Sequence, residues 1–175
     1  MNEIGVLLRF KSWWAHKWVR RGAWALLFLF VYIGIRTYQQ RDLVVGLAPA
    51  LAGVAIDGRA LSLTNAPRAT LVYFWATWCP ICRLEHGTIE SIAGDHPVIT
   101  VAMQSGTDAE LLRYMKEKDL KAPTLNDPGE LAGNWGVRAT PTFFIVDRQN
   151  QVRFREVGLT SEWGLRLRLW YANLS

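Results

Sequence analysis

Both cysteines of this 175-residue chain lie in one short stretch, residues 78–82, which reads WCPIC. They follow directly after the apolar run at residues 71–75. Such a run predicts a central β-strand that is buried on both faces. Pro80 suits the first turn of a helix, because that turn has no use for the N–H that proline lacks. The stretch therefore predicts a strand that ends in two cysteines and continues into a helix, as part of a β-α-β unit.

Several kinds of site use two cysteines at this spacing. A structural zinc site needs four ligands, and His86 alone follows nearby. Haem attachment needs a histidine directly after the second cysteine, where this chain has Arg83. A purely structural disulfide would close a very small loop and restrain the unfolded chain little. We therefore favour a thiol–disulfide redox centre over the zinc site and the structural disulfide.

The expected helix gives the two cysteines unequal roles in such a centre. Cys79 would be exposed at the start of the helix, where unpaired backbone N–H groups and the helix dipole stabilise a thiolate, and we expect it to be the attacking thiol. Cys82, one turn further and more buried, would resolve the mixed disulfide. Trp78, Pro80 and Ile81 would support the active site, with Trp78 capping its surface. An ordinary core position is the alternative for Trp78.

The net charge of +5 belongs entirely to the N-terminal part of the chain. Residues 1–46 carry seven Lys/Arg against two acidic residues, whereas residues 47–175 carry thirteen of each sign. A basic excess around one apolar segment is typical of a membrane-topology signal. We therefore expect no nucleic-acid binding.

Residues 23–35 form an uncharged apolar segment. Alone it is shorter than the roughly 20 residues that a membrane-spanning helix needs. Flanking Trp, Tyr and Arg side chains can lie at the two interfaces, which extends the span to residues 19–38. A buried core helix and a cleaved signal peptide are the alternatives. We favour a retained signal anchor, because the small-residue pattern at residues 48–50 lies well beyond the apolar segment.

We expect four parts along the chain. Residues 1–18 are a cytoplasmic juxtamembrane segment with interfacial Trp13, Trp14 and His16, and residues 19–38 are the anchor. Residues 39–50 are a tether, and residues 51–175 are one globular domain. Five Lys/Arg precede the apolar segment, so the N-terminus should be cytoplasmic and the domain should lie on the outer side of the membrane.

The globular part alternates strand-like and helix-like segments. Asp57-Gly58 predicts a β-hairpin over residues 54–63, and Thr107 with Glu110 forms a capping box for a helix that ends near residue 118. A second hairpin is expected over residues 143–157. The other expected elements are helices at 81–93, 130–135 and 161–172, a strand at 97–103 and a short extended piece at 123–125. This order predicts a mixed sheet with helices on both faces.

Residues 74–85, FWATWCPICRLE, resemble the active-site signature of the TlpA/ResA/CcmG group of membrane-anchored thioredoxin-like proteins, with the suppressor-of-copper-sensitivity branch as the best match. Residues 137–142, VRATPT, resemble the cis-proline loop of that group. The resemblance runs from about residue 49 to the C-terminus and includes the anchor. It implies an α/β thioredoxin fold with an N-terminal β-hairpin and a helical insertion, a redox-active Cys79–Cys82 disulfide, and a cis peptide bond before Pro141.

The resemblance also implies roles for residues around the disulfide. The backbone of Thr140 would pair with the extended chain of a bound partner, and Pro141 would keep that face open. Glu85 lies three residues after Cys82 on an apolar helix stripe, so its pKa should be raised and it could exchange a proton with Cys82. The alternative is an acid that simply complements the helix dipole. Cytoplasmic thioredoxins place the acid in the preceding strand, where this chain has Tyr73.

For the other residues of interest we expect simpler roles. Gln104 and Ser105 lie at the C-terminal end of an expected strand, where the sites of α/β proteins collect, but we favour ordinary polar loop residues over a role in the site. Trp135 should belong to the core. Residues 86–88 lack the helix-kinking proline of the resembled group, so the helix should be straighter. The three methionines, including Met103 and Met115 as core residues, and the three histidines are dispersed. We expect no metal site and no cofactor, and any copper link would come through disulfide repair.

The expected function is that of a periplasmic thiol–disulfide oxidoreductase anchored in a bacterial inner membrane. Members of the resembled group are mostly reductants of periplasmic proteins, supplied with electrons by a transmembrane thiol transporter of the DsbD type. We favour a reductant over an oxidant or isomerase, although residues 80 and 81 do not settle the direction. A thiol chaperone without turnover is the alternative from another class. A peroxidase would need a P-x-x-x-T-x-x-C pattern, which this sequence lacks.

Overall fold

The computed structural model describes residues 3–64 and 66–174, with side chains from residue 17 onward. It divides into two compact units, of which the first ends at Gln39 and the second begins at Gln40. The first unit is a single helix, α1 (Glu3–Gln40). Its part from Lys17 to Gln40 is long and apolar enough to cross a membrane, with a mean hydropathy of 1.4. The side chains of Trp13, Trp14 and His16 lie outside the described residues.

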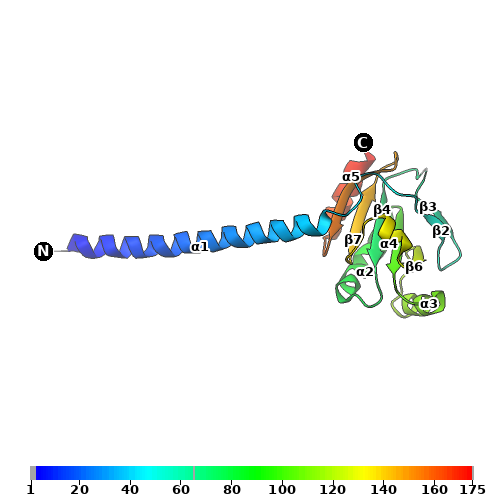
Figure 1. The fold of residues 1–175 in the computed structure, drawn as a ribbon, viewed down its shortest axis with the longest axis horizontal. Coiled ribbons are helices and arrows are strands. Elements are labelled where there is room, and N and C mark those ends of the chain that lie inside the picture. Colours follow the sequence, from blue (N-terminus) through cyan, green and yellow to red (C-terminus); the bar gives the residue numbers. More distant parts are fainter. Residues whose placement is uncertain (1–2, 65, 175) are drawn as a thin grey trace. The chain divides into compact units, whose positions relative to one another are not determined.

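The second unit is built on a six-stranded mixed sheet in the order β1-β8-β7-β4-β5-β6 (Figure 1). Strands β4, β5 and β6 are parallel to one another, and β7, β8 and β1 continue the sheet in antiparallel pairs. All six residues of the central strand β4 are buried, as its apolar run predicts. The strands are β1 (Gly46–Leu47), β4 (Thr70–Trp75), β5 (Val98–Met103), β6 (Thr124–Asp127), β7 (Thr142–Val146) and β8 (Gln151–Val157).

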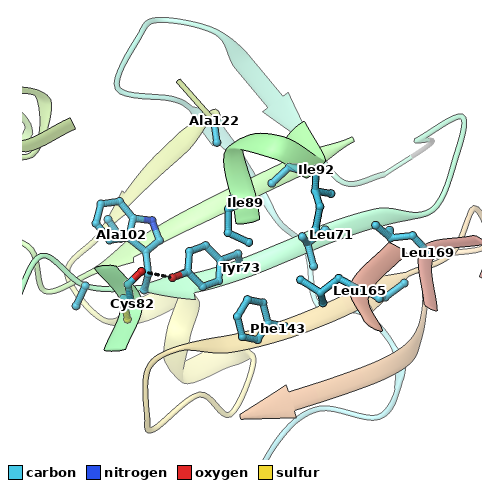
Figure 2. Packing of buried hydrophobic residues seen from close by; sticks show 14 of the residues in the cluster. Leu71, Tyr73, Cys82, Ile89, Ile92, Ala102, Ala122, Phe143, Leu165 and Leu169 are labelled. Atoms are coloured by element: carbon cyan, nitrogen blue, oxygen red, sulfur yellow. Dashed lines mark hydrogen bonds between the residues drawn. The ribbon is translucent and has the colours of Figure 1, made fainter. Parts of the chain in front are cut away.

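Two apolar clusters fill the two sides of this sheet, because successive residues of each strand point to opposite faces. One side is covered by α2 (Pro80–Ala93), α3 (Asp108–Glu117) and α5 (Glu162–Asn173). Figure 2 shows this cluster, in which Tyr73 of β4 and Phe143 of β7 stack at 4.9 Å between ring centres. The other side is covered by residues 43–51, by the hairpin β2 (Ala52–Val54) and β3 (Ala60–Ser62), and by α4 (Glu130–Asn134).

Two turn and cap predictions are confirmed in the structure. Strands β2 and β3 pair around Asp57-Gly58, and Asp57 Oδ1 accepts a hydrogen bond from the backbone N–H of Arg59 at 3.1 Å. At the start of α3, the Thr107 hydroxyl accepts from the Glu110 N–H, and the Glu110 carboxylate accepts from the Thr107 N–H. Both features depend on residues within four positions of each other, so the sequence pattern alone predicts them.

The segment predicted as a tether, residues 39–50, is for the most part integral to the globular unit. Leu43 and Ala48 are buried in the core, and β1 pairs with β8. The backbone N–H of Val44 donates to the carbonyl oxygen of Trp135 at 3.2 Å. The sequence interpretation missed this because a two-residue strand between chain-breaking residues has no detectable alternation. Residues 41 and 42 alone separate the end of α1 from the first core residue.

Candidate active site

Cys79 and Cys82 form a disulfide at the N-terminus of α2. Cys79 is the N-cap residue with extended backbone angles, and Pro80 occupies the first helical turn. The Sγ atom of Cys79 accepts a hydrogen bond from the backbone N–H of Cys82 at 3.2 Å. The sulfur thus takes the place of the side-chain oxygen that usually caps a helix, and it faces the positive end of the helix dipole. The same contact stabilises a thiolate on Cys79 when the disulfide is reduced.

The predicted exposure of Cys79 is wrong, although the order of the two cysteines is as predicted. Cys79 is 4% exposed and Cys82 is fully buried. The loop before β7 covers Cys79, whose Sγ lies 3.6 Å from the carbonyl oxygen of Thr140. Trp78 and Ile81 beside it are 58% and 44% exposed, so exposed apolar side chains flank the reactive sulfur.

The loop that covers Cys79 contains a cis peptide bond between Thr140 and Pro141, which confirms the sequence prediction. Two hydrogen bonds hold the loop. The Thr142 hydroxyl donates to the carbonyl oxygen of Ala139 at 2.7 Å, and the Gly158 N–H donates to the carbonyl oxygen of Pro141 at 2.9 Å. Residues 137–142 and 79–82 are far apart in the sequence. They meet where the carbonyl oxygen of Thr140 lies beside Cys79 Sγ.

Glu85 lies behind the disulfide, on the buried side of α2. It is 2% exposed, and its Oε1 accepts a hydrogen bond from the backbone N–H of Thr160 at 2.9 Å. Burial raises the pKa of the Glu85 carboxyl, and the hydrogen bond from Thr160 opposes that shift. Because the side chain is turned inward, Glu85 is not a solvent-facing acid at the helix N-terminus.

Tyr73 of β4 contacts the backbone of the second cysteine. Its hydroxyl donates to the carbonyl oxygen of Cys82 at 3.5 Å, the contact drawn as a dashed line in Figure 2. Burial, together with the nearby charge of Glu85, raises the pKa of the Tyr73 hydroxyl far above its usual range. Tyr73 is therefore a neutral hydrogen-bond donor at every pH at which the protein works.

Ser105 and Gln104 have structural roles that the sequence interpretation missed. The buried Ser105 hydroxyl accepts from the backbone N–H of Thr77 at 3.1 Å and donates to the carbonyl oxygen of Met103 at 2.9 Å. The indole N–H of Trp78 donates to the carbonyl oxygen of Gln104 at 3.2 Å. The loop after β5 thus holds the two residues that precede Cys79. The available signal was position, because the carboxyl ends of the parallel strands β4 and β5 meet at one edge.

Comparison with known proteins agrees with this geometry. The family model described as Redoxin matches residues 44–162, which is more than half of the chain. The chain belongs to the Redoxin family. A thioredoxin-like protein of Haemophilus influenzae is 32% identical over 160 residues, which cover 89% of this chain and 95% of the relative. A DsbE homologue of Paracoccus denitrificans, described as a thiol:disulfide interchange protein, is 32% identical over 63% of this chain and 64% of its own.

A solved structure supports the same assignment for this Redoxin-family protein. The pneumococcal exposed lipoprotein thioredoxin Etrx1 of Streptococcus pneumoniae superposes with a TM-score of 0.65 at 25% identity, over 70% of this chain and 99% of that one. The Redoxin-family protein thus has a thioredoxin fold and is a thiol:disulfide oxidoreductase of the DsbE/ResA type. Specific closeness to the suppressor-of-copper-sensitivity branch is not shown, and a link to copper stays a prediction.

His86 lies in residues 86–88, where this Redoxin-family protein lacks the helix-kinking proline of the TlpA/ResA/CcmG group. α2 is one continuous helix through residues 86–88. The imidazole ring packs edge-on against Trp75 at 5.1 Å between ring centres, and its Nε2 lies 3.3 Å from the Tyr114 hydroxyl. Burial, with Arg83 and Lys118 nearby, lowers the pKa of His86 to about 4. His86 is therefore a neutral packing residue between β4 and α3.

Trp135 belongs to the core as predicted, packed against Phe74 and Phe144. Met115 is also buried. Among the residues that the structure describes, no three His, Cys, Asp or Glu side chains come together in a way that could hold a metal ion. The expectation that this Redoxin-family protein needs neither metal nor cofactor stays a prediction.

Proposed function

We propose that this Redoxin-family protein reduces protein disulfides on the outer side of a bacterial inner membrane, to which α1 anchors it. The buried carboxyl group of Glu85, one helical turn beyond Cys82, is the observation that favours a reductant over an oxidant. A carboxylate in a poorly solvated site opposes a thiolate nearby. When the thiolate is less stabilised, the dithiol form is less favoured and gives up its electrons more readily. Glu85 thus opposes the stabilising effect of the helix N-terminus on the cysteines.

The reaction uses the two cysteines in order. The Cys79 thiolate attacks one sulfur of the client disulfide and forms a mixed disulfide, and the other client sulfur leaves as a thiolate that takes up a proton. Cys82 then attacks the sulfur of Cys79, which breaks the mixed disulfide and releases the second client thiol. Two electrons have passed to the client, and the Cys79–Cys82 disulfide has formed. In the oxidised form, the Cys82 N–H donates a hydrogen bond to Cys79 Sγ at 3.2 Å.

Glu85 and the cis-proline loop assist these steps. Glu85 accepts the proton that Cys82 loses when it attacks, because Oε1 is held by Thr160 and the second carboxyl oxygen is left for the exchange. The backbone of Thr140 binds the client as an extended chain beside Cys79, and Pro141 presents no N–H that would compete for that chain.

Anchoring and electron supply complete the proposal. The span from Lys17 to Gln40 has the length and composition of a membrane helix, and the basic residues that precede its apolar part favour a cytoplasmic N-terminus. The oxidised protein would be reduced again by a transmembrane thiol transporter of the DsbD type, through the same exchange in reverse. The relatives named thiol:disulfide interchange proteins support protein thiols and disulfides as the partners.

The reduction potential of the Cys79–Cys82 pair tests the direction. The full chain in detergent is equilibrated with glutathione buffers, and the dithiol fraction is measured by thiol alkylation. We expect a potential of about −250 mV or below, whereas a value of about −180 mV or above would assign an oxidant or isomerase. The protein should also accelerate insulin reduction by dithiothreitol. Cys82→Ser should accumulate the mixed disulfide, and Cys79→Ser should form none.

Two substitutions separate the chemical role of Glu85 from its structural role. Glu85→Gln keeps an acceptor for the Thr160 N–H but cannot take a proton. Glu85→Ala removes the acceptor as well, and an unpaired buried N–H costs about 1–3 kcal/mol of unfolding free energy. We expect both variants to resolve the mixed disulfide slowly and Glu85→Ala alone to be destabilised. Normal resolution by Glu85→Gln would rule out proton exchange by this residue.

A further inference from the structure

Helix α5, the C-terminal helix in Figure 1, has two apolar faces. One face carries Leu165, Leu169 and Ala172, which are buried against the sheet. The opposite face carries large apolar side chains at spacings of three and four residues, so they form one stripe. A helix on a protein surface usually presents polar residues there, and an exposed apolar stripe marks an interaction site. Its members and their exposed fractions are Trp163 (83%), Leu167 (64%), Trp170 (59%) and Leu174 (66%).

The two arginines of α5 are held by partners on the globular unit. Arg166 donates to Asp95 at 2.6 Å and to Glu162 at 2.9 Å. Arg168 forms an ion pair with Glu156 at 3.4 Å. At 100° per residue, Arg166 lies about 70° from the middle of the stripe and borders it, whereas Arg168 lies about 130° away, closer to the buried face. The stripe is therefore an uncharged band of Trp and Leu with one basic side chain, Arg166, along one border.

The same edge of the sheet holds α5 and the start of the globular unit. Phe154 of β8 contacts the ring of Tyr171 in α5 at 5.8 Å between ring centres. On the same strand, the guanidinium of Arg155 donates to the carbonyl oxygen of Leu43 at 2.8 Å. The two residues between the end of α1 and Leu43 can extend the chain by about 10 Å at most. The covalent connection therefore limits how far Leu43, and the strand β8 that binds it, can move from the end of α1.

We propose that the exposed stripe of α5 docks on the lipid–water interface of the membrane that α1 spans. This inference rests on the membrane anchoring in the proposed function. Trp and Leu are the side chains with which amphipathic helices lie in this interface, and the stripe carries no charge of its own. The short connection to α1 makes the docking intramolecular in the intact chain, and the stripe itself binds lipid strongly enough to hold the domain after that connection is cut. The docked domain presents its disulfide at a fixed height above the membrane.

The test uses the full chain with a protease recognition sequence inserted between Gln40 and Arg41. The protein is reconstituted into vesicles of phosphatidylethanolamine and phosphatidylglycerol, cleaved and sedimented. We expect the cleaved wild-type domain to remain with the vesicles. A triple variant, Trp163→Gln, Leu167→Gln and Trp170→Gln, should lower its partition to the vesicles by about tenfold or more. Val54→Gln, at a 70%-exposed apolar position on β2, is the control that should not change the partition.

Each other outcome has a distinct meaning. Release of the wild-type domain on cleavage overturns the docking proposal, whereas failure of the uncut chain to sediment overturns the anchoring on which it rests. Insulin reduction by the released triple variant shows that it is folded. A cleaved wild-type domain that elutes as a dimer, when the triple variant elutes as a monomer, assigns the stripe to a second copy and also overturns the proposal.

Discussion

Acidification should lower the unfolding free energy of the globular unit through His86. The pKa of His86 is about 4 in the folded protein, below its ordinary value of 6.5. Between these two values the unfolded chain binds a proton on His86 that the folded chain does not bind. The unfolding free energy rises with pH wherever the unfolded state binds more protons. The contribution of His86 is therefore fully present above pH 6.5 and is lost progressively as the pH falls toward 4.

The size of this effect follows from the same interval. At about 1.4 kcal/mol per pH unit, the interval from 6.5 to about 4 corresponds to at most about 3.5 kcal/mol. By pH 5, about 2 kcal/mol of that would be lost. The imidazole is partly exposed and solvent screens part of the interaction, so we expect a loss of about 1–2 kcal/mol between pH 7.5 and pH 5.

Urea unfolding of the full chain in detergent micelles, followed by near-ultraviolet circular dichroism at pH 7.5, 6 and 5, measures this loss. The control is His86→Gln, which keeps a polar group toward Tyr114 and does not titrate. Glu85 acts with the opposite sign, because its raised pKa favours the folded state at low pH and that contribution is lost as the pH rises. Since Glu85 is present in both proteins, their difference isolates His86. Parallel pH profiles for the two proteins would refute this reasoning.

Two further substitutions test contacts that hold the site and the start of the globular unit. Ser105→Ala leaves the backbone N–H of Thr77 without its acceptor. We expect this to lower the unfolding free energy by about 1–2 kcal/mol and to slow insulin reduction. The control Ser62→Ala, at an exposed position of β3, should do neither. Gly136→Ala places a methyl group against the backbone of residue 42 at a left-handed φ of 68°. We expect it to lower the unfolding free energy by more than about 2 kcal/mol and to expose residues 41–50 to limited proteolysis. Gly133→Ala, which has open space around it, is its control; unchanged proteolysis of Gly136→Ala would contradict the close packing of this segment.

The sequence interpretation succeeded where a feature depends on neighbouring residues. The strand before Cys79, the helix start at Pro80 and the capping box at Thr107 each follow from side chains a few positions apart. The cis bond before Pro141 is different, because the residues alone would favour a trans bond and the family resemblance supplied the prediction.

The stripe on α5 was also present in the sequence, as apolar residues at helical spacing on two sides of one helix. It could not be interpreted there, because periodicity does not say which of two apolar faces is buried. The packing of Leu165 and Leu169 against the sheet decides that Trp163, Leu167 and Trp170 face outward. The same limit applies to the supposed tether, whose residues enter the core through pairing with β8, more than 100 positions later.

By itself the sequence determined the redox pair, the helix on which it lies and the apolar N-terminal span, because these are properties of contiguous residues. The tertiary structure decided how the two cysteines are buried and which residues contact them. It buries Cys79 under the carbonyl of Thr140, holds the residues before it with Ser105, and ties Glu85 to Thr160 across 75 positions. Each of these contacts joins segments that meet only when the sheet has formed, and desolvation at such contacts shifts the pKa of Glu85 and His86.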